Sequence, residues 1–294
     1  MKSIAELRQQ LQVPMRRYND IGGLLFADWV SIYITWLFLR FGIGPTPATI
    51  GMLVVGLSGA ALLPFGGTAA VFGGVLLVCF YILDCVDGEV ARFQKVDKYL
   101  WTFHGFFFGY FVKSAFYIGL AIYAFRLTQE AWILSFGLAA VLALLFKAFL
   151  DQVALFLTAR HVFLRTKSER KNILKELSKF RVAPAESKEI KGPSLDWFQA
   201  LSMYGGFLGI VRSIFMSFDL SILGFIMLAV LDLWVSPVNI FGTLIDLKTV
   251  FILVYGVVLP LNFFNHLFYY VRSDKFYKDS ARLLSEIGTF SDNK

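Results

Sequence analysis

Charged residues are scarce in this chain of 294 residues: they make up 17% of it, whereas apolar residues make up 57%. Soluble domains have about a quarter charged residues, so the composition excludes a soluble enzyme and a disordered chain. Cysteine is scarce too. Cys79 and Cys85 lie six residues apart in one apolar run, where a helix points them in opposite directions and excludes a disulfide between them. We find no internal repeat and no cleavable signal pattern before the first apolar run.

Long apolar runs fill most of the sequence. We count seven of them, at roughly 24–42, 48–65, 70–92, 99–125, 131–158, 213–235 and 249–271. A run of about 20 residues crosses a hydrocarbon layer of about 30 Å as a helix, whereas barrel strands alternate and are about half as long. The sequence therefore predicts an all-α, polytopic membrane helix bundle.

The positions of Lys and Arg decide between six and seven spans. The net charge is +7, and the basic residues gather in the N-terminal segment and in the polar insert at 159–207. Seven spans would place these two segments on opposite sides, against the positive-inside rule. If 24–42 lies in the interface instead, only Arg126 and Lys248 remain outside. We predict six transmembrane helices preceded by an N-terminal interfacial amphipathic helix, with a seventh span as the alternative.

This topology divides the chain into six parts. They are a cytoplasmic amphipathic N-terminus at 1–23, the interfacial helix and a turn at 24–47, transmembrane helices 1–4 at 48–158, a basic cytoplasmic insert at 159–207, transmembrane helices 5 and 6 at 208–271, and a cytoplasmic tail at 272–294. The insert contains a helical pattern with one apolar and one basic face, which predicts either a solvated linker or a helix resting on anionic headgroups.

Four charges lie within the third apolar run, which ends LDCVDGEVARF. Charged side chains are costly inside a membrane and mark a candidate functional site. On a helix, one face of about 100° gathers Asp84, Asp87, Gly88, Ala91 and, at its edge, Arg92. Two carboxylates one turn apart suit a hard cation such as Mg²⁺, which bridges to phosphate oxygens. The face therefore predicts a metal-dependent phosphate site.

Small and basic residues complete this face. Gly88 and Ala91 leave room beside the backbone for a bulky ligand, and Arg92 offers forked donors that pair with phosphate. Glu89 is turned away from the face. In the alternative, purely structural interpretation, Lys or Arg side chains on neighbouring helices neutralise the two Asp residues.

Two motifs resemble those of a known family. The pattern D-x-x-D-G-x-x-A-R at 84–92 is similar to the first half of the signature of the CDP-alcohol phosphotransferase family, and P-T-x-x-T at 45–49 looks like its Pro-Asn-x-x-Thr element. The family's architecture, an interfacial helix followed by six transmembrane helices, is similar to the topology predicted from charge. Its members move a phosphoryl-alcohol group from a CDP-alcohol, often CDP-diacylglycerol, to an acceptor alcohol and release CMP.

The resemblance assigns a role to each residue of the face. It implies that Asp84 and Asp87 hold Mg²⁺ or Mn²⁺, that Gly88 and Ala91 line the cytidine pocket, and that Arg92 faces the phosphates. It also implies a homodimer among membrane lipids, in the cell membrane, with its active site facing the cytoplasm and with no nucleic-acid partner.

The second half of the family signature, Gly-x-x-x-Asp-x-x-x-Asp, is missing at the expected spacing. Its positions fall on Trp101, Gly105 and Gly109. With a shift of one residue, His104 takes the place of the third acidic residue, where an imidazole would bind a metal or accept a proton from an attacking hydroxyl. The other interpretation of His104 is a hydrogen-bonded packing residue.

We therefore expect a membrane phosphotransferase of phospholipid biosynthesis, with His104 as the candidate catalytic residue. The main alternative is a catalytically inactive homologue that acts as a membrane scaffold or as a nucleotide- or lipid-binding subunit, because both later carboxylates are missing. A transporter that uses the paired carboxylates is a third possibility, although transport does not require the residues at 88, 91 and 92.

Overall fold

The computed structural model describes residues 3–15, 26–96, 98–163, 218–235, 237–240 and 242–272. Most of these residues are helical, as the sequence predicts. The chain divides into two compact units, Met1–Val141 with Trp197–Leu259 and Leu142–Asp196 with Pro260–Lys294. Nearly all of the predicted basic insert and cytoplasmic tail lie outside the described residues.

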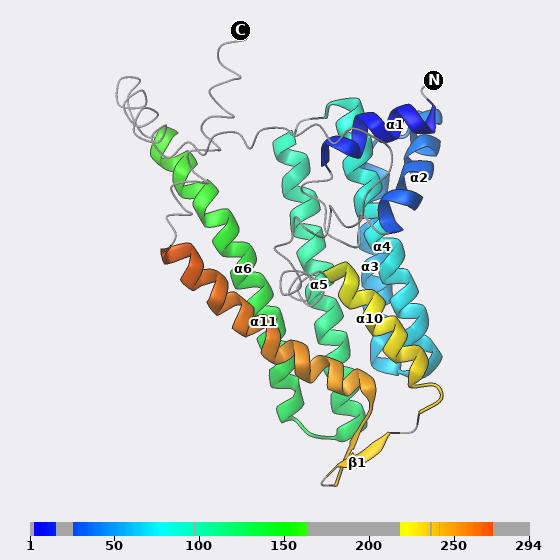
Figure 1. Ribbon diagram of the computed structural model, residues 1–294, viewed down its shortest axis with the longest axis vertical. Helices are drawn as coiled ribbons and strands as arrows, with labels where there is room; N and C mark the ends of the chain where they lie inside the picture. Colours follow the sequence, from blue (N-terminus) through cyan, green and yellow to red (C-terminus); the bar gives the residue numbers. More distant parts are fainter. Residues whose placement is uncertain are drawn as a thin grey trace. The chain divides into compact units, whose positions relative to one another are not determined.

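The helices follow the apolar runs closely (Figure 1). In chain order they are α1 (Ile4–Leu11), η1 (Val13–Met15), α2 (Asp28–Arg40), α3 (Thr46–Leu62), η3 (Leu63–Phe65), α4 (Gly67–Gln94), α5 (Lys98–Thr128), α6 (Trp132–Phe163), α10 (Phe218–Leu231) and α11 (Leu247–Arg272). Between α10 and α11, β1 (Val238–Ile240) and β2 (Thr243–Ile245) pair as an antiparallel hairpin.

Within the part of the chain that the structure describes, five helices are long and apolar enough to cross a membrane. Their candidate spans are Thr46–Phe65, Gly67–Gln94, Phe107–Thr128, Trp132–Leu150 and Leu247–Phe268. The length and composition of these helices confirm the prediction of a multi-pass, helical membrane protein. The apolar part of α10, Leu220–Leu231, is shorter, and α2 has 13 residues, which corresponds to about 20 Å.

Glycines allow α3, α4 and α5 to approach one another at backbone distance. A Cβ built on Gly73 would lie 2.6 Å from the carbonyl oxygen of Gly59, and one built on Gly59 would lie 2.8 Å from that of Gly73. On α5, a Cβ at Gly119 would lie 2.6 Å from the carbonyl oxygen of Ala60. Small residues at helix crossings permit this packing in membranes, where apolar burial between helices contributes little. The crossings hold α4 against α3 along its first half.

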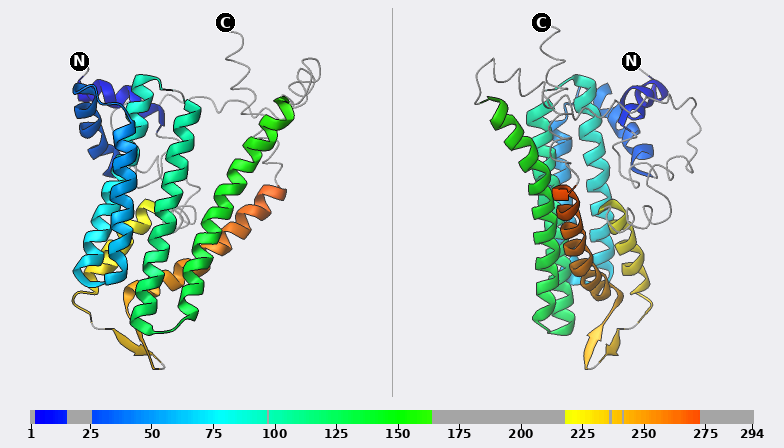
Figure 2. Two further views of the ribbon diagram at one scale, coloured as in Figure 1. Left: turned by 180° about the vertical axis from the view of Figure 1, so that it is seen from behind. Right: turned by 60° about the vertical axis from the view of Figure 1, so that its left-hand side comes forward.

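Helices α1 and α2 lie beside the C-terminal end of α4 (Figure 2). Leu7, Leu11 and Ile32 form a buried cluster, against which Phe93 of α4 packs. A helix of eight residues is marginal by itself, so this packing and the capping box between Ser3 and Glu6 stabilise α1. Helix α1 therefore packs beside the helix that carries the candidate site.

Aromatic rings connect α5, α10 and the first part of α11. The ring of Phe116 is edge-on to those of Phe218, Phe225 and Phe251, at centroid distances of 5.4, 5.6 and 6.2 Å. Edge-to-face pairs of this kind stabilise a packed core beyond their buried area. In the second unit, the rings of Phe146 on α6 and Phe263 on α11 lie 5.8 Å apart.

Candidate functional site

All the predicted residues of the 84–92 face lie on the last turns of α4, a single helix of 28 residues. Asp87 and Ala91 are buried, Asp84 and Gly88 are half-buried, and Arg92 is exposed. Lys95, which caps the helix, has a left-handed backbone with φ of 53° and ends it immediately after the motif. The structure thus places the two carboxylates and the guanidinium on one continuous helix, as the periodicity predicts.

Asp87 is linked to the start of α3. The hydroxyl Oγ1 of Thr49 lies 3.0 Å from Oδ2 of Asp87 and 3.3 Å from the carbonyl oxygen of Pro45. Both Thr49 and Asp87 are buried. A hydroxyl donor satisfies one oxygen of a buried carboxylate that would otherwise be costly. This contact joins the two motifs that carry the family resemblance, which spacing along the sequence does not reveal.

The side chain of Arg92 folds back along α4 over Gly88. A Cβ built on Gly88 would lie 3.2 Å from Nη1 of Arg92. The space that Gly88 leaves is therefore shared with the guanidinium, whereas the sequence alone led us to expect it to serve a ligand. Two further acidic residues of α4, Asp87 and Glu89, lie within five residues of Arg92 on the same helix. Arg92 is thus held near the acidic face, where its forked donors are available to an anion.

Glu89 forms a second buried network on the opposite side of α4. Its Oε1 accepts hydrogen bonds from Nε2 of Gln12 and from Oγ of Ser31, both at 2.8 Å, and its Oε2 accepts one from Oγ1 of Thr35 at 2.6 Å. The prediction that Glu89 is turned away from the face gave no indication of these partners. They come from α1 and α2, about 50 to 80 residues earlier in the chain.

The two carboxylates on this face of α4, Asp84 and Asp87, are an incomplete donor set for a divalent metal. Among the described residues there is no group of three or more His, Cys, Asp or Glu placed to hold a metal ion. Mg²⁺ is often held by one or two carboxylates together with substrate phosphates and water, a set that Asp84 and Asp87 can begin but not complete. A metal on this face would therefore depend on a phosphate ligand.

His104 lies on α5, but its side chain is outside the described part of the structure, as is that of Trp101. Its predicted catalytic role remains a prediction. One described cation on the same helix, Lys113, has its Nζ 5.4 Å from the ring centroid of Tyr110 and 5.3 Å from that of Phe218. These aromatic faces stabilise the ammonium inside the bundle.

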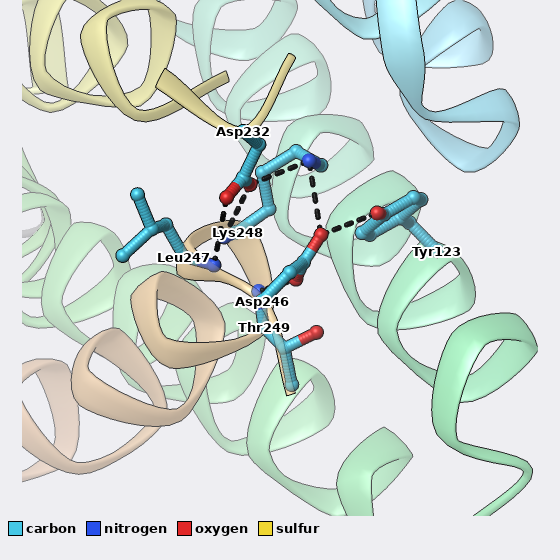
Figure 3. A network of polar contacts seen from close by, with 6 residues as sticks. All are labelled: Tyr123, Asp232, Asp246, Leu247, Lys248 and Thr249. Carbon is cyan, nitrogen blue, oxygen red and sulfur yellow. Dashed lines mark hydrogen bonds and ion pairs between the residues drawn. The ribbon is translucent and has the colours of Figure 1, made fainter. Parts of the chain in front are cut away.

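A polar cluster that the sequence did not reveal surrounds Lys248 at the other end of the bundle (Figure 3). Its Nζ lies 2.5 Å from Oδ2 of Asp232 and 2.9 Å from Oδ2 of Asp246, and all three side chains are buried. The hydroxyl of Tyr123 on α5 donates a hydrogen bond to Asp246. Lys248, predicted only as an isolated outside charge, is therefore the centre of an ion-pair cluster.

The same two carboxylates cap α11. Oδ1 of Asp246 accepts the backbone N–H of Thr249 at 2.8 Å, and Asp232 accepts those of Leu247 and Lys248 at 3.1 and 3.2 Å. Burial raises the pKa of Asp246, but its hydrogen bonds from Tyr123, Lys248 and Thr249 outweigh burial and hold that pKa below its usual range. The cluster is structural: its two carboxylates cap α11 and join the start of that helix to Tyr123 of α5.

The face on α4 is thus the stronger candidate site, because it combines a carboxylate pair with an exposed guanidinium. Comparison with known proteins adds no assignment: no family model matches this sequence, and no curated relative matches it either.

Proposed function

We propose that this chain is a membrane phosphotransferase of phospholipid biosynthesis, related to the CDP-alcohol phosphotransferase family. It would move a phosphoryl-alcohol group from a CDP-alcohol, such as CDP-diacylglycerol, to an acceptor alcohol and release CMP. One observation carries the proposal: Asp84 and Asp87 share a face of α4 with Arg92, and Thr49 of the second family-like motif contacts Asp87. Two separate motifs meeting at one carboxylate favour a common site.

The chemistry divides among the residues of this face. A Mg²⁺ or Mn²⁺ ion held by Asp84 and Asp87 would neutralise the pyrophosphate and stabilise the leaving CMP. Arg92 would pair with phosphate oxygens through its forked donors, and Gly88 and Ala91 would line the pocket of the cytidine moiety. Arg92 must then swing away from Gly88, which its exposed position permits.

The transfer needs a proton acceptor. The oxygen of the acceptor alcohol attacks the β-phosphorus, the bond from that phosphorus to CMP breaks, and the alcohol loses its proton. We assign this proton to His104, because both carboxylate positions of the family signature on α5 are glycines here, at 105 and 109. The lack of a carboxylate base predicts slow turnover.

The proposal includes the topology. Helix α10 would be the fifth of six spans and α2 the interfacial helix. The face of α2 that carries Trp29, Tyr33 and Leu37 is exposed, whereas Ser31 and Thr35 on its other face are buried. Trp and Tyr favour the boundary between lipid and water, and a helix of about 20 Å is too short to cross the bilayer. The site would face the cytoplasm of a cell-membrane homodimer.

A second candidate function is a catalytically inactive homologue that binds a nucleotide or lipid as a scaffold subunit. The observation that favours it is the presence of glycine at 105 and 109, where the family pattern has carboxylates. This candidate keeps the fold and the α4 face but predicts no CMP release.

The deciding experiment is metal-dependent binding of CDP-diacylglycerol to the purified chain in nanodiscs, measured as a rise in Tm with Mg²⁺ or Mn²⁺. Asp87→Asn should abolish the rise. Glu130→Gln is the matched control, because it also replaces a carboxylate by an amide but lies in the turn after α5, outside the α4 face. A rise of Tm that persists in Asp87→Asn would contradict the proposed site. CMP release with added alcohols then separates the enzyme from the scaffold.

A further inference from the structure

Lys113 places a charge inside a candidate membrane span, and no step of the proposed reaction uses it. It lies on α5 within the span Phe107–Thr128, and its side chain is half-buried. In the described part of the chain its Nζ forms no ion pair, and it lies 5.4 and 5.3 Å from the ring centroids of Tyr110 and Phe218. A charged side chain inside a span is costly and marks a candidate functional site, here one without an anionic partner.

Phe218 connects this ammonium with the helix that carries the carboxylate pair. Its ring lies 5.3 Å from Nζ of Lys113 and is edge-on to the ring of Phe80 on α4, at 6.4 Å between centroids. Phe80 precedes Asp84 by four residues, so the two share one face of α4 and lie one helical turn apart. The ammonium therefore lies near the turn of α4 that precedes Asp84.

Helix α5 leaves room one turn before Lys113. Gly109 is buried, yet no described atom lies within 4 Å of a Cβ built on it. Along a helix, the direction of Gly109 falls between those of Val112 and Lys113. Val112 packs toward α3 and α4, since a Cβ built on Gly56 of α3 would lie 2.7 Å from its Cγ1 and 2.8 Å from Cδ2 of Phe80. The room beside Gly109 therefore lies between the side of α5 that faces α4 and the side that carries Lys113.

The two helices bring this room to the level of the carboxylate pair. Three residues join α4 to α5, and the helices run in opposite directions (Figure 1). The turn before Val112 on α5, which contains Gly109, is therefore level with the turn after Phe80 on α4, which contains Asp84. The described residues thus combine a carboxylate pair, open space and, one turn farther along α5, an ammonium without an anion.

We propose that Lys113 binds the negatively charged group of the acceptor, so that the acceptor is an alcohol phosphate rather than a neutral alcohol. An ammonium attracts phosphate oxygens as a point charge, and its two aromatic neighbours hold it in place. The body of the alcohol then occupies the room beside Gly109, and its hydroxyl lies at the level of Asp84. The inference rests on the proposed function only for the alcohol's role as acceptor. Binding of a phosphate group at Lys113 is independent of it.

Two neutral variants remove the ammonium. Lys113→Met keeps a long, flexible side chain, and Lys113→Gln keeps the test valid if the Met variant fails to fold. Lys113→Arg retains a cation. Lys147→Met is the matched control, because Lys147 is also a half-buried lysine in a candidate span, on α6. All variants are compared in phosphatidylcholine nanodiscs with Mg²⁺.

The readout is the ratio of the Kd for glycerol to the Kd for glycerol phosphate, two alcohols that differ by one phosphate group. In the unaltered chain and in Lys147→Met we expect glycerol phosphate to bind about tenfold more tightly, which corresponds to one hydrogen bond to a charged group. The ratio should fall to about one in Lys113→Met and Lys113→Gln, and only partly in Lys113→Arg. An unchanged ratio in both neutral variants would overturn the proposal.

The same variants reveal two other partners of the ammonium. Membrane lipids also carry phosphate. If phosphatidylglycerol raises the Tm of the unaltered chain but not of Lys113→Met, and glycerol phosphate does not bind, the ammonium holds a lipid headgroup. Asp219 follows Phe218 in the sequence. If Asp219→Asn and Lys113→Met lower Tm equally, and glycerol phosphate does not bind, the ammonium belongs to an ion pair. Either result would overturn the proposal.

Binding of CDP-diacylglycerol to the unaltered chain separates this inference from the proposed function. If CDP-diacylglycerol raises Tm with Mg²⁺ but glycerol phosphate shows no binding that depends on Lys113, the proposed function stands and this inference fails. If glycerol phosphate binds through Lys113 but CDP-diacylglycerol does not bind, the proposed function fails and the phosphate site stands.

Discussion

Thr49 and Asp87 show how a single hydroxyl supports the candidate site. Oγ1 of Thr49 donates a hydrogen bond to Oδ2 of Asp87 at 3.0 Å, and both side chains are buried. In a buried environment, a hydrogen bond to a carboxylate contributes more to stability than it does in water. Asp84, one turn away on the same face, is half-buried and therefore less dependent on a protein donor. The two carboxylates of the pair thus differ in environment although they share a helix face.

Thr49→Val should lower the free energy of unfolding by about 1 to 3 kcal/mol, because it leaves one oxygen of buried Asp87 without its donor. Denaturant unfolding in mild detergent measures the loss. Thr49→Ser, which retains the hydroxyl, should remain near the unaltered chain. Equal stability of the Val and Ser variants would show that the hydroxyl does not support the carboxylate.

Asp246 predicts an acid limit to stability. Its folded-state pKa lies below the usual value of about 3.9, so its contribution is complete above that value and is lost as the pH falls through the folded pKa. We expect Tm to be flat between about pH 7 and 5 and to fall below about pH 4. In Asp246→Asn, Tm should start lower and fall less over the same interval. A variant that keeps the full acid dependence would assign it to other carboxylates.

The sequence was sufficient to predict how residues of the same helix lie relative to one another. Periodicity alone placed Asp84, Asp87 and Arg92 on one face of α4. It could not find the partners of Glu89 or Lys248, because Gln12 and Asp232 come from other segments and look like ordinary polar residues in their own surroundings. His104, whose side chain is not described, remains a prediction from spacing.

Helix boundaries were predictable because the bilayer sets the length of the apolar runs. The run at 70–92 gave α4 at Gly67–Gln94, and the run at 249–271 gave α11 at Leu247–Arg272. Where a helix has apolar residues on its exposed face as well as its buried face, the sequence did not predict which residues are buried. The run at 24–42 did not reveal that two buried residues of α2, Ser31 and Thr35, are polar and donate hydrogen bonds to Glu89.

Close helix crossings depend on single glycines. Gly73→Val should separate α3 from α4, since even a Cβ would lie 2.6 Å from a backbone oxygen that cannot rotate away, and we expect a loss of about 1 to 3 kcal/mol of stability. Gly224→Ala on α10 is the control, because no described atom lies within 4 Å of the added Cβ. Thermal unfolding in nanodiscs compares the two. A Gly73 variant as stable as the control would mean that the crossing is adjustable.

The charge distribution of the whole molecule predicts its orientation in the membrane. The turn before α5 and the turn after it lie at opposite ends of a candidate span, and Lys95 and Gln129 are exposed there. With Cys79 and Cys85 replaced by alanine, a cysteine at 95 should react with an impermeant maleimide only after the membrane is opened. A cysteine at 129 should react in intact cells. The reverse pattern would invert the topology and place the α4 site outside.

The ion-pair cluster around Lys248 also bears on how the protein is inserted into the membrane. In the proposed topology, the segment from Asp232 to Lys248 must travel through the bilayer to reach the far side during insertion. Lys248 forms ion pairs with Asp232 and Asp246. These three side chains together carry one net negative charge, whereas unpaired they would be two separate negative charges and one positive charge. Tyr123 is inserted earlier, with α5, and its hydroxyl donates a hydrogen bond to Asp246 on the far side. The last two helices are therefore suited to enter together, as one translocated unit that docks onto earlier spans.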